Sequence, residues 1–168
     1  MANSTFSGPI RSESTIKTIS KNATTGTITE VMTMGDAPVA LADENKTLDN
    51  ATHSGRTMVV PAITANRTIT LPSPTGGATF KLIYGGAAEE TENVIIDTGS
   101  DTNFFIGGVQ HLDTNADNVS VNSDGDSNSV LTLIDFGIME INIVAKDSTN
   151  WYVWGNVVSA TAPTFGDQ

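Results

Sequence analysis

Apolar and polar residues alternate along several short segments of the chain. The alternating segments cover residues 27–33, 67–71, 79–84, 129–135 and 138–144, and many of their residues are β-branched. Successive side chains of a strand point to opposite faces of a sheet, so a period of two predicts half-buried strands. Helical periodicity is hard to find, because Gly, Pro, Asn, Asp and Ser separate the apolar clusters.

Turn-forming stretches divide these segments from one another. Residues 72–77 are rich in Pro and Gly, residues 85–90 begin with a Gly pair, and residues 123–128 contain an Asp-Gly turn signal. Short strands at such close spacing are typical of sandwiches and barrels. The sequence therefore predicts an all-β fold, either an antiparallel β-sandwich or a barrel-like (jelly-roll-like) domain.

The first residues and one internal stretch depart from this pattern. Residues 1–24 have few bulky apolar residues, which predicts an extended N-terminal arm or a first strand. Residues 37–54 mix Pro with acidic and amide side chains, which indicates a loop excursion between strands. We expect residues 25–168 to form a single β domain, because a chain of this length is long enough to bury one core.

Small polar residues dominate the composition. Thr, Ser and Asn supply 52 of the 168 residues, whereas charged residues make up 16%. Thr is β-branched and suits a strand, and its hydroxyl lets it face water without adding charge. A face rich in Thr is therefore expected to meet solvent or a partner.

The formal net charge of the chain is −11 at pH 7. A surface with that charge repels phosphate backbones and anionic membranes, so we expect neither nucleic acid nor a membrane as a partner. Residues 1–21 are weakly basic, with Arg11, Lys17 and Lys21 against a single acid, whereas residues 82–145 hold eleven acids and neither Lys nor Arg. A solvated acidic surface beside scattered lysines would also explain this asymmetry.

Several functional classes are excluded by what the sequence lacks. The chain contains no Cys, which excludes disulfides, thiolate metal sites and a Cys nucleophile. No apolar run is long enough to cross a bilayer as a helix, and the first residues lack the basic and apolar regions of a secretory signal.

Residues that could carry catalysis are few. The two histidines, His53 and His111, do not have the spacing of a zinc site. A Ser/His/Asp triad would need one of them, but the chain has no Gly-x-Ser-x-Gly motif. Carboxylate pairs such as Asp124 and Asp126 fall in polar turns, where a glycosidase pair across a cleft is not expected. We therefore predict that the protein is not an enzyme and has no catalytic residues.

One acidic segment partly matches a calcium-binding loop. Residues 113–124 place oxygen-bearing side chains at the first, third, fifth and twelfth positions of an EF-hand-like loop. Asn118 stands where such a loop needs Gly, and the setting predicts no flanking helices, so an EF-hand is excluded. We assign no metal site and no cofactor, and the alternative that residues 113–128 bind Ca²⁺ as a simple loop stays open.

Trp151, Tyr152 and Trp154 form an aromatic cluster near the end of the sequence. Strand alternation places Trp151 and Val153 on one face and Tyr152 and Trp154 on the other. We expect one face to enter the core and the other to be covered by a subunit or a sugar. The three aromatic residues are therefore candidate core or oligomer contacts.

Three stretches of the sequence resemble a known group of proteins. Residues 6–13 read Phe-Ser-Gly-Pro-Ile-Arg-Ser-Glu, residues 69–84 contain Leu-Pro-Ser-Pro-Thr-Gly-Gly, and residues 150–157 read Asn-Trp-Tyr-Val-Trp-Gly-Asn-Val. Together they resemble small virion structural proteins of marine tailed bacteriophages, in particular head decoration (cement) proteins. Similar Leu-Pro-x-Pro and Asn-Trp-Tyr-Val phrases also occur in phage fibre and baseplate domains.

The resemblance implies a small, non-enzymatic, β-rich protein, usually a homotrimer, on the capsid exterior of the virion. Such a protein binds the major capsid protein and stabilises the shell against the internal pressure of packaged DNA. We expect the N-terminal arm to make the capsid contacts, through Phe6, Ile10, Arg11, Lys17 and Lys21. The alternative is a fibre or baseplate module that binds a host glycan.

Overall fold

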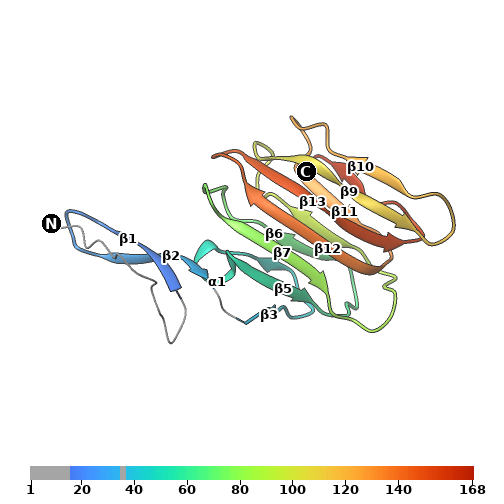
Figure 1. The fold of residues 1–168 in the computed structure, drawn as a ribbon, viewed down its shortest axis with the longest axis horizontal. Helices are drawn as coiled ribbons and strands as arrows, with labels where there is room; N and C mark the ends of the chain where they lie inside the picture. Colours follow the sequence, from blue (N-terminus) through green and yellow to red (C-terminus); the bar gives the residue numbers. More distant parts are fainter. Residues whose placement is uncertain (1–15, 35–36) are drawn as a thin grey trace, which may run out of the picture.

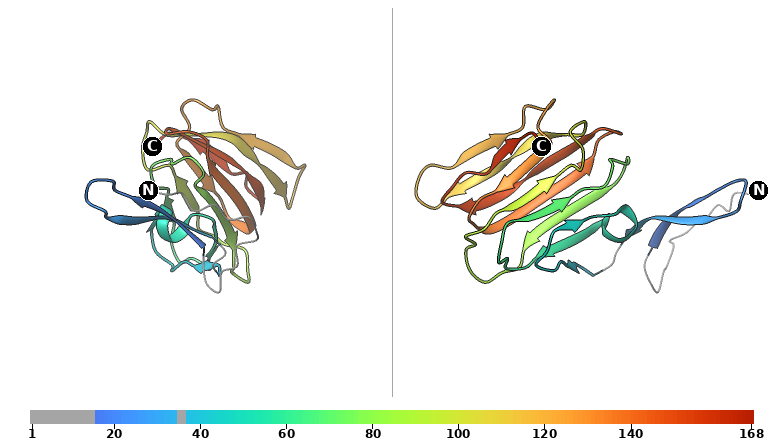
Figure 2. Two further views of the ribbon diagram at one scale, coloured as in Figure 1. Left: turned by 60° about the vertical axis from the view of Figure 1, so that its left-hand side comes forward. Right: turned by 180° about the vertical axis from the view of Figure 1, so that it is seen from behind.

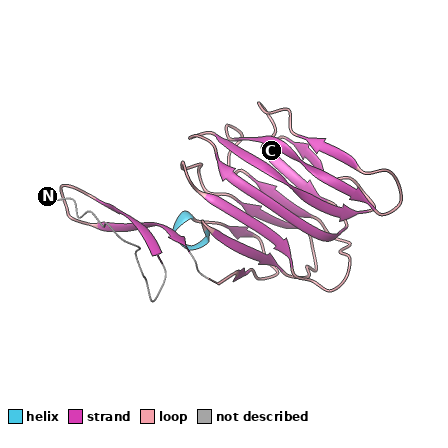
Figure 3. Cartoon of the chain, in the orientation of Figure 1, coloured by secondary structure: helices cyan, strands magenta, loops and turns pink. Residues whose placement is uncertain are grey.

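The computed structural model describes residues 16–34 and 37–168 of the chain. Two β-sheets pack face to face, and a two-stranded hairpin lies beside them (Figure 1, Figure 3). The hairpin joins β1 (Ile16–Lys21) to β2 (Ile28–Met34), and β2 lies next to α1 (Asn50–His53). The views of Figure 2 agree that the hairpin extends away from the sheets on the side of α1. Within the described residues α1 is the only helix, and none there is long and apolar enough to cross a membrane.

Seven strands form the larger sheet and five form the smaller one. In spatial order, the strands of the larger sheet are β10 (Val119–Asn122), β9 (Phe104–Asp113), β13 (Asn150–Ser159), β12 (Phe136–Ala145), β7 (Thr79–Tyr84), β5 (Arg56–Val60) and β3 (Val39–Ala40). Those of the smaller sheet are β14 (Thr164–Gly166), β11 (Val130–Leu133), β8 (Val94–Asp97), β6 (Arg67–Thr70) and β4 (Lys46–Thr47). One hydrophobic core fills the space between the two sheets.

The prediction of an all-β, sandwich-like fold is confirmed, but the prediction of antiparallel sheets is wrong. β3, β5 and β7 run parallel in the larger sheet, and β4, β6 and β8 run parallel in the smaller one. After each of these strands the chain crosses to the opposite sheet, so two consecutive strands, one in each sheet, make one turn of a coil. The next strand of the same sheet starts one such turn later and points the same way. Because the opposite sheet supplies the return path, these parallel strands need no crossover helix.

The sheets are not closed into a barrel. The larger sheet ends at β10 and β3, and the smaller sheet ends at β14 and β4. Since closure would remove these edges, the fold is a sandwich rather than a barrel.

The connections divide the sandwich into two halves. The N-terminal half, β3 to β8, winds through three turns with one strand of each turn in each sheet. The C-terminal half, β9 to β14, contains the antiparallel pairs β9–β10 and β12–β13, although β9 and β13 are parallel neighbours. The halves are joined in both sheets by antiparallel pairs, β7 with β12 and β8 with β11.

Aromatic pairs in the core connect these two halves. Trp151 of β13 packs edge-to-face on Phe80 of β7, with ring centroids 5.7 Å apart. Phe136 of β12 packs in the same manner on Tyr84, with centroids 5.1 Å apart. Because each pair has one member in each half, the halves share a single core.

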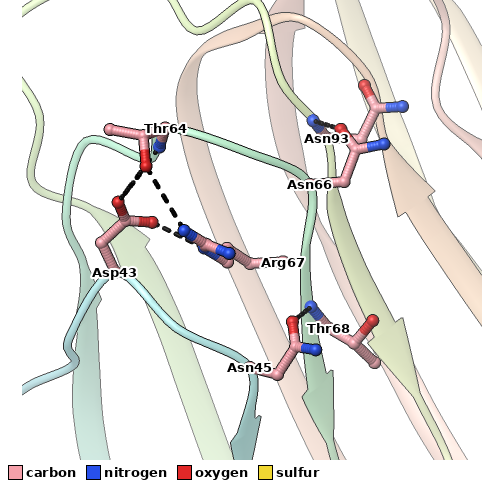
Figure 4. Close-up of polar contacts among 7 residues, drawn as sticks. All are labelled: Asp43, Asn45, Thr64, Asn66, Arg67, Thr68 and Asn93. Atoms are coloured by element: carbon pink, nitrogen blue, oxygen red, sulfur yellow. Dashed lines mark hydrogen bonds and ion pairs between the residues drawn. The ribbon is translucent and has the colours of Figure 1, made fainter.

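Asparagine side chains tie successive turns of the N-terminal half together (Figure 4). The Asn45 Oδ1 atom accepts a hydrogen bond from the backbone N–H of Thr68 at 3.0 Å, and Asn66 Oδ1 accepts one from the N–H of Asn93 at 2.9 Å. Asn45 immediately precedes β4, and Asn66 immediately precedes β6. Each amide therefore extends the hydrogen-bond ladder by one bond beyond the end of its strand.

An ion pair connects the loop before β4 with the first residue of β6. The Asp43 Oδ1 atom accepts a hydrogen bond from Arg67 Nε at 2.6 Å, and its Oδ2 atom accepts one from the Thr64 hydroxyl at 2.7 Å (Figure 4). The hydrogen bonds from Arg67 and Thr64 lower the pKa of Asp43 to about 2. The carboxylate therefore stays ionised, and bonded to both partners, throughout the neutral and mildly acidic range.

Two segments that the sequence set apart contain short regular elements. The predicted loop excursion at residues 37–54 includes β3, β4 and α1, and the Asp49 carboxylate caps α1 by accepting a hydrogen bond from the Thr52 N–H at 2.7 Å. Of the predicted arm at residues 1–24, the part before residue 16 lies outside the described residues. The rest forms β1 and the start of the hairpin turn.

Candidate functional site

The outward side of the larger sheet, which we call the outer face, is the most distinctive surface of the sandwich. Its side chains alternate with buried ones along β9, β13, β12, β7 and β5. The outer face consists of Ile106, Gln110, Leu112, Tyr152, Trp154, Asn156, Val158, Ile138, Glu140, Asn142, Val144, Thr79, Lys81, Ile83, Thr57 and Val59.

The aromatic residues of β13 divide between the core and the outer face as the alternation predicts. Trp151 is fully buried and Val153 is 2% exposed, whereas Tyr152 is 42% exposed and Trp154 is 50% exposed. Trp151 is thus a core residue. Tyr152 and Trp154 are the two aromatic side chains of the outer face, and their exposed rings are available to a partner.

An open depression of about 320 Å³ lies on the outer face beside Trp154. Trp154, Asn142, Lys81 and Thr57 line it and stand in one row across four strands, because each is paired with the next in the sheet register. Neighbouring strands are separated by about 4.8 Å, so this row is roughly 14 Å long. The depression therefore combines one exposed indole with this polar row, and Arg56 and apolar residues of the same strands complete its lining.

The outer face carries almost no charge. Among the residues that define it, only Lys81 and Glu140 are charged, and Lys81 Nζ lies 2.7 Å from Glu140 Oε1. The hydrogen bond from Lys81, followed by its positive charge and a hydrogen bond with Asn142, lowers the pKa of Glu140. The outer face is therefore neutral, although the chain has a net charge of −11.

The candidate capsid-contacting residues fall in two groups. Lys17 and Lys21 lie in β1, and the side chain of Lys21 is exposed. Phe6, Ile10 and Arg11 lie outside the described residues.

The hairpin also presents two large apolar side chains. Ile19 is 56% exposed and Ile28 is 58% exposed. Ile28 of β2 lies opposite Lys21 of β1 in the hairpin register. The alternating pattern of residues 27–33 predicts a strand here, but it does not say that this strand would lack a sheet to cover it.

Neither histidine is positioned to activate a serine. His53 is buried in α1, and its Nδ1 atom accepts a hydrogen bond from the Asp49 N–H at 3.0 Å. The neighbouring Ser54 is also buried, and its hydroxyl accepts a hydrogen bond from the Thr79 N–H at 3.1 Å. The imidazole of His111, buried in β9, bonds through Nε2 to the Ser159 carbonyl oxygen at 3.0 Å.

The segment that resembles a calcium loop is divided by β10. At one end of this strand, Asp113 accepts hydrogen bonds from the N–H groups of Asn115 and Ala116. At the other end, Asp124 accepts hydrogen bonds from Ser127, whose hydroxyl is the main cause that lowers the pKa of Asp124 to about 2. In residues 16–34 and 37–168, no group of three or more His, Cys, Asp or Glu side chains could hold a metal ion.

Sequence reasoning missed one buried polar pair. The Tyr84 hydroxyl donates a hydrogen bond to Glu90 Oε1, and Glu90 is 7% exposed. Burial, with a smaller contribution from Glu90, raises the pKa of Tyr84 to about 12. The pair fastens the Gly-rich loop after β7 to the end of the sandwich, and the polar composition of that loop gave no sign that Glu90 would be buried.

The outer face, with its exposed aromatic residues and its depression, is thus the candidate site that the described residues offer. The chain matches no protein-family model, no curated protein and no solved structure.

Proposed function

We propose that this protein is a structural component of a tailed-phage virion that binds the outside of the capsid. In this role it stabilises the shell against the pressure of packaged DNA, and it acts as a homotrimer bound to the major capsid protein. The resemblance of residues 6–13, 69–84 and 150–157 to head decoration proteins supports the proposal.

The observation that carries the proposal is the hairpin outside the sandwich. Ile19 and Ile28 are each more than half exposed on it. An isolated two-stranded hairpin is marginally stable in water, and exposed apolar side chains on such an element favour a partner surface that covers them. The hairpin therefore supports attachment through the N-terminal region, where Lys17 and Lys21 add positive charge.

The proposed role depends on buried area rather than on chemistry. A hairpin that covers a junction between coat subunits must be exposed to water again before those subunits separate. Because the protein binds the assembled shell and not the separated subunits, it raises the free energy that is needed to disassemble the shell. In the proposed trimer, each of the three copies contributes one sandwich, and each sandwich carries one such hairpin.

The test is saturable binding of the purified full chain to emptied capsids of the phage that encodes it. We expect the wild type to bind with a fixed stoichiometry. A variant with both Ile19→Glu and Ile28→Glu should bind at least about tenfold more weakly, because each change removes roughly 1.5–3 kcal/mol of apolar burial.

The matched control is Ile138→Glu, which changes an isoleucine of the outer face that is 62% exposed. This variant should bind capsids as the wild type does. Loss of binding in the control with unchanged binding in the hairpin variant would contradict the hairpin assignment, and a wild type that does not bind capsids would overturn the proposed function.

A fibre or baseplate module that binds a host glycan is the second candidate. The exposed Tyr152 and Trp154 favour it, because aromatic rings on a sheet surface can stack against sugars. Saturable binding to host polysaccharide without binding to capsids would support this candidate over the first.

A further inference from the structure

We infer that the depression beside Trp154 is a binding site for a neutral saccharide. The inference concerns the outer face alone and holds for either location in the virion, since a cement protein and a fibre module can both present this face. It follows from the exposed indole, the polar row beside it and the neutrality of the surface around it.

The indole of Trp154 provides the apolar part of the site. Its side chain is half exposed on a sheet that buries the neighbouring Trp151 completely. A pyranose ring has one face made of C–H groups, and such a face packs flat against an aromatic ring while the sugar hydroxyls stay at the edge. An exposed indole therefore suits a ligand that is apolar on one face and polar around its rim.

The row of side chains next to the indole provides the polar part. Asn142 lies opposite Trp154, Lys81 lies opposite Asn142, and Thr57 lies opposite Lys81. Their amide, ammonium and hydroxyl groups offer both donors and acceptors to sugar hydroxyls. The depression of about 320 Å³ falls within the range of small-molecule sites, and its elongated row suits a short chain of linked sugar rings.

The electrostatics of the site select a neutral ligand. Two cations line the depression, but Lys81 is already paired with Glu140 at 2.7 Å, and the Arg56 guanidinium donates hydrogen bonds to the carbonyl oxygens of Ala37 and Thr52. Both side chains are therefore already engaged and do not select an acidic sugar. The chain as a whole has a net charge of −11 and repels anionic polysaccharides at long range. A neutral hexose or N-acetylhexosamine oligomer needs no free cation in the site and is not repelled by the net charge of the chain.

A second copy of the chain is the competing occupant of this surface. The polar residues Thr57, Lys81 and Asn142 line the depression directly. Lysine is depleted in the core of subunit interfaces, and Lys81 stands within this row. The position of Lys81 therefore favours a sugar over a second protein surface at this depression.

The experiment titrates the full-length protein with soluble hexamers of glucose, mannose and N-acetylglucosamine, and with an anionic hexuronate hexamer. Binding is measured by calorimetry and, in the wild type, by tryptophan fluorescence. Of the two tryptophans, Trp151 is buried and Trp154 is exposed, so a saccharide-dependent change in emission reports on Trp154. We expect at least one neutral hexamer to bind saturably and the hexuronate hexamer not to bind.

Two variants locate the site. Trp154→Ala should weaken the binding of the neutral hexamer about tenfold, because an aromatic stacking contact contributes roughly 0.5–1.5 kcal/mol in addition to its buried area. Ile138→Ala is the matched control, since it removes an exposed apolar residue of the outer face that does not line the depression. Its affinity should stay within about twofold of the wild type, and circular dichroism should show that both variants are folded.

Three results would overturn the inference. The first is that none of the neutral hexamers binds. The second is that Trp154→Ala binds as tightly as the wild type. The third is that sedimentation shows a wild-type oligomer which Trp154→Ala converts to monomer without any saccharide binding, since this would make the face a subunit interface. Capsid binding is measured separately with the hairpin variants, so failure of this inference and failure of the proposed function are distinguishable.

Discussion

The two halves of the sandwich build the same two layers with different connections. In the N-terminal half, each strand is followed by one in the opposite sheet, and sheet neighbours within this half are parallel. In the C-terminal half, β9 and β10 follow one another within one sheet, as do β12 and β13. The strands of the N-terminal half contain two to six residues, whereas β9, β12 and β13 contain ten each.

This difference determines what holds each half together. A ten-residue strand forms a long backbone ladder and buries a side chain at every second position. A two-residue strand such as β3 or β4 can do little of either, and the N-terminal half compensates with side chains that bridge its turns. Asp43, Asn45 and Asn66 supply these bridges (Figure 4).

The largest expected effect tests whether the halves unfold together. Trp151→Ala should lower the free energy of unfolding by about 3–5 kcal/mol, as is typical when a large buried aromatic side chain is removed. Trp151 is fully buried and packs on Phe80 of the other half. We therefore expect one cooperative transition for the whole sandwich, measured by urea denaturation and by hydrogen exchange in β5 and β7.

Trp154→Ala is the control for this change, because it removes the same side chain from the exposed side of the same strand. Its effect on stability should be about 0.5 kcal/mol or less. Two separate transitions in the Trp151→Ala variant, with the N-terminal half unchanged, would show that the halves are independent.

The positions of side chains within strands were the most predictable part of the molecule. Alternation correctly separated Trp151 from Trp154, because the orientation of a side chain depends only on the local backbone. The direction of strand pairing was not predictable in this way. Which strands lie on the two sides of β5 depends on contacts across the whole chain, and alternation is the same for parallel and antiparallel neighbours.

The sequence also gives only a weak indication of the coiled path of the N-terminal half. Successive turns differ in length, since Met58 lies opposite Val39 whereas Phe80 lies opposite Arg56, and a fixed repeat is therefore absent. One signal was present: an Asn precedes β4, β6 and β8, as Asn45, Asn66 and Asn93. The neutrality of the outer face was equally hidden, because it emerges only when outward residues from five strands are brought together.

The next prediction concerns the bridges between turns. Asn66→Ala removes the acceptor for the Asn93 N–H and should lower the free energy of unfolding by about 0.5–1.5 kcal/mol. Asn156→Ala is the matched control in the C-terminal half, because Asn156 is an exposed residue inside the ten-residue strand β13. It should change stability by about 0.5 kcal/mol or less in the same urea titration. Equal losses in the two variants would contradict the view that side chains support the N-terminal half more than the C-terminal half.

The smallest expected effect is a pH dependence that compares one carboxylate from each half. The pKa values of Asp43 and Asp124 are both lowered to about 2 from an ordinary value of 3.8. A lowered folded-state pKa stabilises the protein above the ordinary value, and this stabilisation is lost as the pH falls from about 4 to about 2. Asp43→Asn and Asp124→Asn should therefore each be less stable than the wild type at pH 7, and each difference should shrink over that acidic range.

The partners of the two carboxylates predict where the effects appear. Asp43 binds Thr64 and Arg67, which belong to the next turn of the N-terminal half, whereas the partners of Asp124 all lie within residues 126–128. Asp43→Asn should accordingly increase hydrogen exchange across β4 and β6 at pH 7. Asp124→Asn should increase it only in the loop that follows β10. If Asp43→Asn also altered exchange only in its own loop, the ion pair would be a local contact and would not connect the turns.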